Sequence, residues 1–317
     1  METIVFLDHG TIPAHISIPR PTFCHQWHQH ATTTPSQVIA RLQLATIAIT
    51  NKVVLNSQVL AKLPQLKFIA IAATGTNNVD LDYCRSHNIK VANIQGYATR
   101  SVPEHVIAMI FALKRNLAGY QQDIDNGEWQ HQQQFCFFTH SITDIAGSTL
   151  GIMGKGSLGQ AVATVAKALG MNVLFAEHAG ATQCRDGYHP FEQVLREADI
   201  ISLHCPLTPT TKNMIAAPQL ALMKSSAIII NTSRGGLINE QALVDALLSC
   251  QIAGAGIDVF TTEPALPSNP LIAHCQLPNL ILTPHVAWGS DSAIQTLVNQ
   301  LIDNINSFHQ GTHKNQL

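Results

Sequence analysis

Short apolar runs alternate with amphipathic stretches along the first third of the chain. The apolar runs are rich in β-branched residues and each is long enough for one buried strand; they occupy residues 3–7, 46–50, 67–73 and 90–94. Between them, apolar residues recur at helical spacing over 36–44, 57–63 and 81–87. Strands that alternate with helices predict an α/β unit whose parallel sheet is covered on both faces.

The turn that follows the third of these strands, at 74–80, is polar and contains Gly75. It lies at the carboxyl end of a strand, which is the edge where open α/β sheets bind ligands. Its backbone N–H groups are therefore candidates for holding a carboxylate. An ordinary strand-to-helix turn is the alternative that these residues leave open.

A longer helix is expected directly after this first unit. Ser101 and Glu104 have the spacing of a capping box, in which the serine caps the helix and the glutamate bonds back to it. Apolar residues at helical spacing then continue to about Leu117. We interpret this helix as a connector between two domains, followed by a polar loop and arm at 118–148.

The most informative stretch of the chain begins with a short apolar strand at 149–153. It leads into Gly154, Gly156 and Gly159, in the pattern G-x-G-x-x-G, and then into a helix at 158–169. Alone, this pattern is weak evidence, but a strand before it and a helix after it form the context of a dinucleotide-binding turn. A packing turn in another kind of α/β protein is the alternative.

Each part of this stretch has a physical task. The first glycine permits the tight turn, the second lets a pyrophosphate approach the backbone, and the third lets helix and strand pack closely. The helix N-terminus supplies N–H groups and a positive dipole end to the phosphates. The next strand, at 172–176, ends at Glu177, whose carboxylate would accept bonds from the ribose hydroxyls and repel a 2′-phosphate. NAD is therefore favoured over NADP.

The alternation continues through the second half, with strands expected at 200–203, 227–230, 254–259 and 280–282. Turns after the last three of these strands carry Arg234, Glu263 and His285. Because the carboxyl ends of parallel strands meet at one sheet edge, the three side chains are expected beside the cofactor. The final helix, at about 290–308, is expected to return to the N-terminal unit.

These three residue types fit the reduction of a 2-keto acid. Histidine exchanges a proton near neutrality and can supply one to a carbonyl oxygen, and a carboxylate on its other nitrogen fixes the tautomer. Arginine binds a planar carboxylate through two parallel bonds. Taken singly, however, Arg234 could be a surface residue, Glu263 a loop residue and His285 a satisfied buried histidine.

Composition narrows the classes of partner. With 317 residues, about two domains are expected, and 46% hydrophobic residues can form substantial cores. Charged residues make up 12%, the net charge is −2, and there is no basic stripe, so neither nucleic acid nor a membrane is an expected partner. The chain begins in a strand rather than a signal peptide, and its seven cysteines lack a C-x-x-C pair. We therefore expect reduced thiols and a cytoplasmic location.

One cluster of metal-ligand types stands apart from these motifs. Cys24, His25, His28 and His30 lie close together in the sequence and have side chains that bind zinc. A polar segment in a chain rich in histidine and glutamine is the alternative, and we predict no metal as part of the function.

Taken together, these motifs closely resemble those of the D-isomer-specific 2-hydroxyacid dehydrogenases, over nearly the whole chain. The matching stretches are TGTNNVDL (74–81), GYATRSVPEH (96–105), GIMGKGSLGQ (151–160), LHCPLTPTT (203–211), NTSRGGLINEQAL (231–243), GIDVFTTEP (256–264) and TPHVAW (283–288). Within the family, the chain is most similar to the glycerate dehydrogenases, also called hydroxypyruvate reductases. The resemblance thus implies NADH-dependent reduction of a 2-keto acid, foremost hydroxypyruvate to D-glycerate.

The resemblance also implies a two-domain α/β architecture. A flavodoxin-like substrate domain would be built from both chain ends, 1–99 and 288–317, with a Rossmann cofactor domain inserted at 100–287 and the active site in the cleft. The family is usually homodimeric through the cofactor domain, so a homodimer is expected.

Roles for single residues follow from the resemblance. His285 would be the acid/base, Glu263 its partner, and Arg234 the arginine that binds the substrate. Gly75 and Thr76 would offer N–H groups to the substrate carboxylate, with Tyr97 nearby.

Around the cofactor, the resemblance places further residues. Ser157 and Leu158 would face the pyrophosphate, and Glu177 the ribose. The adenine side would be lined by Cys205 and Pro206, while Thr232 and Asp258 would lie near the nicotinamide.

Two departures from the family pattern matter. Lys155 replaces a more usual apolar or aromatic residue, and we interpret it as a solvated side chain. Glu177 stands where aspartate is common in the family, with His178 adjacent. Other readings stay open: a reductase of glyoxylate, D-lactate or phosphoglycerate type, or a non-catalytic dinucleotide sensor like a corepressor of this family.

Overall fold

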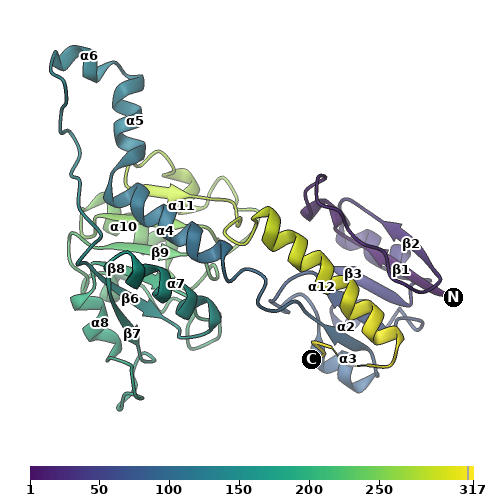
Figure 1. Cartoon of the computed structure of the whole chain (residues 1–317). Helices are drawn as coiled ribbons and strands as arrows, with labels where there is room; N and C mark the ends of the chain where they lie inside the picture. Colours follow the sequence, from purple (N-terminus) through teal and green to yellow (C-terminus); the bar gives the residue numbers. More distant parts are fainter. Residues whose placement is uncertain (313) are drawn as a thin grey trace. The chain divides into compact units, whose positions relative to one another are not determined.

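The computed structural model describes residues 1–312 and 314–317. The chain divides into two compact units, Met1–Tyr97 with Gly289–Leu317, and Ala98–Trp288. Each unit has its own parallel sheet with helices on both faces (Figure 1). The α/β fold class expected from the alternating pattern is therefore confirmed. Among the described residues, every helix is too short or too polar to span a lipid bilayer.

The first unit is a doubly wound sheet of five parallel strands in the order β2-β1-β3-β4-β5, which is the flavodoxin-like order. The strands are β1 (Glu2–Phe6), β2 (His25–Gln29), β3 (Ile47–Thr50), β4 (Phe68–Ile71) and β5 (Lys90–Ala92). The central strands β3 and β4 are buried at every position, because helices cover both of their faces.

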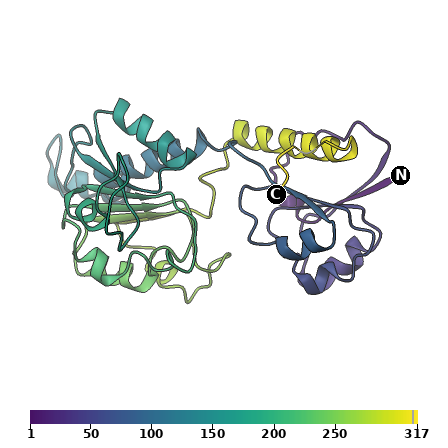
Figure 2. The same cartoon turned by 90° about the horizontal axis from the view of Figure 1, so that it is seen from below.

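Two helical layers enclose this sheet. One core contains side chains from α1 (Val38–Leu42), α2 (Ser57–Leu60) and α3 (Leu81–Ser86). The long helix α12 (Asp291–His309) packs on β4, where the ring of Phe308 stacks on that of Phe68 at 4.5 Å between centroids. Figure 2 shows α12 on one side of the sheet and the shorter helices on the other.

Strand β2 was not anticipated by the hydrophobic pattern. It is a polar edge strand in which His25 and Trp27 are partly buried and the other three residues are exposed, and it pairs in parallel with β1. His25, a member of the candidate metal cluster, instead bonds through Nδ1 to the carbonyl oxygen of Phe23 at 2.7 Å. Across the described residues, no group of three metal-ligating side chains is assembled.

The second unit contains a six-stranded parallel sheet in the order β11-β10-β9-β8-β6-β7. The strands are β6 (Thr149–Met153), β7 (Asn172–Ala176), β8 (Ile200–Leu203), β9 (Ile228–Asn231), β10 (Gly254–Ile257) and β11 (Leu280–Leu282). From β6, the chain first adds β7 on one side and then β8 on the other. This reversal creates a topological switch point between β6 and β8, where open α/β sheets bind ligands.

Helices cover both faces of this sheet as well. On one face, α4 (Ser101–Lys114) packs against α7 (Ser157–Ala168) and contacts β9 and β10. The other face forms a core with α8 (Phe191–Glu197), α9 (Ala217–Leu220), α10 (Glu240–Leu248) and α11 (Pro270–Ala273).

The capping box predicted at Ser101 is wrong. The cap position of α4 is Arg100, without a side-chain capping bond, and Ser101 lies inside the first turn, almost fully buried. Its hydroxyl donates instead to the carbonyl oxygen of Ala287 at 2.7 Å. The serine therefore ties the start of α4 to the segment that follows β11.

The segment expected as a polar loop and arm contains two helices. After α4 ends, Asn116 adopts the left-handed conformation with φ of 50° and redirects the chain. Helices α5 (Leu117–Asp125) and α6 (Glu128–Gln132) follow and extend away from the sheet of their own unit (Figure 1).

Candidate active site

The glycine turn after β6 has the geometry that its sequence predicts. Gly154 has φ of +109°, and a Cβ there would lie 2.6 Å from the carbonyl oxygen of His204. A Cβ on Gly159 would lie 2.0 Å from the carbonyl oxygen of Gly154. Neither position tolerates a side chain, because both clashes involve backbone atoms.

The space in front of this turn is open. Gly156 is the cap residue of α7 and provides no side-chain cap, and a Cβ added to it would meet nothing within 4 Å. The first N–H groups of a helix have no intrahelical acceptor, so those at Ser157 and Leu158 are available to an anion. The turn therefore fits a pyrophosphate at the positive end of α7.

Glu177 lies at the end of β7, where the ribose-binding acid is expected. Its side chain is 3% exposed and carries a close ion pair with Arg185, at 2.6 Å between Oε1 and a guanidinium nitrogen. Hydrogen bonds from the Arg185 side chain and from the backbone N–H of His178 lower the pKa of Glu177 to about 2. The carboxylate is thus charged and already bound within the protein.

Arg185 was missed by the sequence reasoning. It lies eight positions beyond Glu177 in a loop without hydrophobic periodicity, so no local pattern connects the two residues. They meet because the loop returns to the strand, where the N–H of Glu177 donates to the carbonyl oxygen of His189 at 2.8 Å.

Lys155 is not the solvated side chain that we expected. It is partly buried, and its Nζ lies 5.0 Å from the ring centroid of Phe175 and 4.8 Å from that of Tyr188. Aromatic faces attract a cation at this range. Phe175 of β7 and Tyr188 of the loop that carries Arg185 therefore hold Lys155, a second cation, near the end of β7.

The turns after β8 and β9 contain the residues expected near adenine and nicotinamide. Cys205 is half-buried and Pro206 exposed, and burial raises the pKa of the Cys205 thiol, which keeps it neutral. In the following turn, Oγ1 of Thr232 is buried without a hydrogen-bond partner among the described residues. A buried hydroxyl without a partner is costly, so Thr232 fits a site completed by a bound cofactor.

Asp258, expected near the nicotinamide, is fully buried. Its carboxylate accepts bonds from the Thr283 hydroxyl at 2.6 Å and from the N–H groups of Val286 and Ala287 at 2.8 and 3.0 Å. These bonds fix the loop after β11 on both sides of His285. Contact of Asp258 with a nicotinamide stays a prediction.

His285 and Glu263 form a close pair. Nδ1 of the histidine lies 2.7 Å from Oε2 of the glutamate, and Oε1 of the glutamate accepts the N–H of Phe260 at 3.0 Å. The carboxylate therefore holds a proton on Nδ1 and leaves Nε2 for exchange with a ligand. His285 also has φ of 56°, a conformation that is uncommon for residues other than glycine, costs backbone energy and occurs often at functional sites.

Arg234 lies in the turn after β9, next in the sheet to the strand that precedes Glu263. It is half-buried, and its guanidinium donates to the carbonyl oxygen of Ser233 at 2.7 Å. A Cβ on the neighbouring Gly235 would lie 1.9 Å from the carbonyl oxygen of Phe260. The loops that carry Arg234 and Glu263 therefore touch, and only glycine permits the contact.

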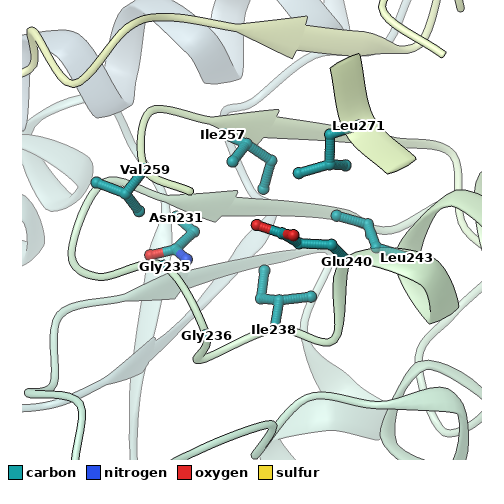
Figure 3. A pocket seen from close by; sticks show the side chains of 9 residues that line it. All are labelled: Asn231, Gly235, Gly236, Ile238, Glu240, Leu243, Ile257, Val259 and Leu271. Carbon is teal, nitrogen blue, oxygen red and sulfur yellow. The ribbon is translucent and has the colours of Figure 1, made fainter. Parts of the chain in front are cut away.

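A small pocket behind these loops contains a further acid that the sequence reasoning missed. Glu240, the first residue of α10, accepts the N–H of Thr261 and the amide of Asn269, both at 2.8 Å. Figure 3 shows its side chain among the pocket residues, which are Asn231, Gly235, Gly236, Ile238, Leu243, Ile257, Val259 and Leu271. Glu240 thus anchors the loop that ends in Glu263.

In the first unit, Gly75 and Thr76 lie in the turn after β4, at the carboxyl edge of that sheet. The turn is fixed by the Thr74 hydroxyl, which donates to the carbonyl oxygen of Ile94 at 2.7 Å. Tyr97 is the last residue of this unit before the second begins. The assignment of these residues to a substrate stays a prediction.

Comparison with known proteins agrees with these observations. Residues 107–287 match the model of the D-isomer specific 2-hydroxyacid dehydrogenase family, NAD binding domain. A putative 2-hydroxyacid dehydrogenase of Haemophilus influenzae is 53% identical over 98% of this chain and 99% of its own. A glycerate dehydrogenase of Methylorubrum extorquens is 47% identical, over 99% and 98%.

A solved structure extends the agreement to the fold. The NAD-complexed D-isomer specific 2-hydroxyacid dehydrogenase of Lactobacillus delbrueckii ssp. bulgaricus is 25% identical, with a TM-score of 0.77 over 99% of each chain. The family resemblance inferred from the motifs is confirmed, as is the expectation of NAD as cofactor. The chain belongs to the D-isomer-specific 2-hydroxyacid dehydrogenases, a family of oxidoreductases, and its second unit contains their NAD-binding domain.

Proposed function

We propose that this enzyme reduces hydroxypyruvate to D-glycerate with NADH. The observation that carries the proposal is the His285–Glu263 pair, held at 2.7 Å at the same sheet edge as the glycine turn. The glycerate dehydrogenase of Methylorubrum extorquens, 47% identical over nearly the full length, supports hydroxypyruvate as the substrate.

Bound NADH supplies the hydride, and the chain supplies proton, charge and orientation. His285 gives its Nε2 proton to the carbonyl oxygen as the alcohol forms, while Glu263 stabilises the charged imidazole through Nδ1. Arg234 binds the substrate carboxylate as a fork. Gly75 and Thr76 add N–H donors to that carboxylate, with Tyr97 nearby.

The cofactor is assigned by the same reasoning. Ser157 and Leu158 offer N–H groups to the pyrophosphate, and Glu177 lies at the ribose. Cys205 and Pro206 flank the adenine side, whereas the hydroxyl of Thr232, which has no hydrogen-bond partner among the described residues, meets the nicotinamide end near Asp258. The proposal thus assigns 100–287 to the cofactor and the two chain ends to the substrate.

Initial rates of NADH consumption by the purified protein test the proposal. Hydroxypyruvate, glyoxylate, pyruvate and 3-phosphohydroxypyruvate are compared as substrates. Hydroxypyruvate is expected to have the highest kcat/KM. A higher value for another acid would transfer the assignment to that acid, and NADH binding without turnover of any acid would favour a dinucleotide sensor.

We further propose that the enzyme is a homodimer, assembled through the arm that contains α5 and α6. Phe135 is 90% exposed and Phe138 78% exposed in this arm, and a second copy would remove both rings from water. Sedimentation of wild type is expected to give a dimer, and the F135S/F138S variant a monomer. Leu44, 68% exposed in the first unit, provides the control L44S, which should stay dimeric.

A further inference from the structure

The carboxylate of Glu177, which should distinguish NAD from NADP, already accepts four hydrogen bonds from the protein. An ionised carboxylate has about four acceptor positions. On Glu177, Oε1 accepts the N–H of His178 at 2.8 Å and a guanidinium N–H of Arg185 at 2.6 Å. Oε2 accepts the backbone N–H of Arg185 at 3.1 Å and its Nε–H at 2.8 Å. A ribose hydroxyl must therefore compete with bonds that already exist.

The arginine that fills this carboxylate also faces solvent. The Arg185 side chain is 55% exposed, whereas that of Glu177 is 3% exposed, so the guanidinium covers the buried acid and presents a positive charge outward. Its Cζ lies 4.1 Å from the ring centroid of Tyr188, which also attracts Lys155 at 4.8 Å. Arg185 and Lys155 thus both lie against the ring of Tyr188, close to Glu177.

This arrangement weakens both ways in which an acid selects NAD. Glu177 cannot give full bonds to the ribose hydroxyls without releasing Arg185, and its charge is balanced by the guanidinium, so it repels a 2′-phosphate less. The outward guanidinium N–H groups are in addition good donors to a phosphate. We propose that Arg185 narrows the discrimination between NADH and NADPH, so that this enzyme binds both. The inference rests on the proposed function, because it needs a dinucleotide at this site.

The test measures binding rather than turnover. The intrinsic fluorescence of NADH and NADPH is titrated against the full-length protein, and the ratio of their dissociation constants is compared between variants. R185Q removes the charge, and R185K keeps a charge without the fork. Arg196 supplies the matched control R196Q, because it is 54% exposed and pairs with Glu192 at 3.1 Å in the same unit. Thermal unfolding without nucleotide verifies that each variant is folded.

In wild type, NADPH is expected to bind within about tenfold of NADH. In R185Q, NADPH should bind roughly tenfold to hundredfold more weakly, the usual effect of losing a charge-assisted bond, whereas NADH should bind at least as tightly as in wild type, because Glu177 is then free to accept the ribose hydroxyls. R196Q should match wild type. R185K should lie between the two, and it decides the question should R185Q fail to fold.

Three results would overturn the inference. Wild type could bind NADPH more than about tenfold less tightly than NADH. R185Q could leave the ratio of the two constants at its wild-type value, or R196Q could change it as much as R185Q does. If neither nucleotide bound wild type, the proposed function would fail as well, so the two failures are distinguishable.

Discussion

The two units share a strand order, but different kinds of residue lie at the carboxyl edges of their sheets. In each, the first strand lies between the second and the third, β1 between β2 and β3, and β6 between β7 and β8. The chain leaves β1 through Asp8 and leaves β6 through Gly154 and Gly156. One unit therefore has a carboxylate at its switch point, and the other has glycines.

In the first unit, the carboxylate of Asp8 accepts backbone N–H groups at the carboxyl edge of the sheet. This carboxylate, almost fully buried, accepts the N–H groups of Asn51 at 2.9 Å, Lys52 at 2.6 Å and Val53 at 3.2 Å, which follow β3. These donors would otherwise attract an external anion. In the second unit, the N–H groups at the start of α7 meet open space at Gly156.

Strand order alone therefore does not make a cofactor site. Each unit has N–H groups at its switch point, after β3 in the first unit and at the start of α7 in the second, and in the first unit the Asp8 carboxylate of the protein itself accepts them. The dinucleotide is therefore expected to bind the second unit alone.

The largest effect is expected where chemistry is assigned to the second unit. H285A should lower kcat about 10²–10⁴-fold, because the proton donor is lost, with little change in NADH binding. In the first unit, His15 forms a similar pair with Asp291 at 2.8 Å, so H15A is the matched control. Steady-state kinetics with hydroxypyruvate measure both variants, and a kcat for H285A equal to that of H15A would remove His285 from the mechanism.

The open switch point can be filled in the manner of the first unit. G156D should place a carboxylate among the N–H groups of α7 and weaken NADH binding by about a hundredfold. Stability should barely change, since aspartate is a good helix cap and a Cβ there meets nothing within 4 Å. G156A is the control for added bulk. Calorimetric titration with NADH decides, and binding as tight in G156D as in G156A would refute the comparison.

The filled switch point can be weakened in turn. D8N replaces one acceptor oxygen of the carboxylate by an NH2 group, whose donors then face the backbone N–H donors after β3. This change should lower the free energy of unfolding by about 1–3 kcal/mol. NADH binding by the folded protein should be unchanged, because Asp8 belongs to the first unit. Urea denaturation measures the first effect and titration the second. A free energy of unfolding equal to that of wild type would mean that the bonds from Asp8 to the N–H groups after β3 do not stabilise the protein.

A smaller effect concerns acid sensitivity in the second unit. Burial lowers the pKa of His204 to about 4, and its Nε2 lies 2.8 Å from the hydroxyl of Ser202. Between pH 6.5 and 4 the unfolded chain therefore takes up a proton that the folded ring refuses, and stability falls as the pH falls. The slope is at most about 1.4 kcal/mol per pH unit. Urea midpoints at pH 7 and pH 5 should differ less in H204Q than in wild type; equal differences would contradict the assignment.

Sequence predicted the parts of the molecule that local pattern controls. Buried central strands are runs of β-branched residues, and the glycine turn must be glycine because backbone atoms approach it. The pairing of His285 with Glu263 was also expected, through the resemblance to the family.

What sequence could not predict depends on contacts between distant residues. Polar strand β2 forms because β1 offers it a free edge, not because of its own hydrophobicity. Ser101 bonds to Ala287 instead of capping its helix, and Arg185 reaches Glu177 through a loop without periodicity. Each outcome is decided by a partner that no local spacing indicates.

The identity and handedness of the product formed from hydroxypyruvate provide the decisive test of the proposed reaction. Purified wild-type protein is incubated with NADH and hydroxypyruvate, and the product is resolved on a chiral column while NADH consumption is followed. The account predicts one D-glycerate for each NADH consumed. L-glycerate as the product, or no NADH consumption by a protein that binds the nucleotide, would contradict it.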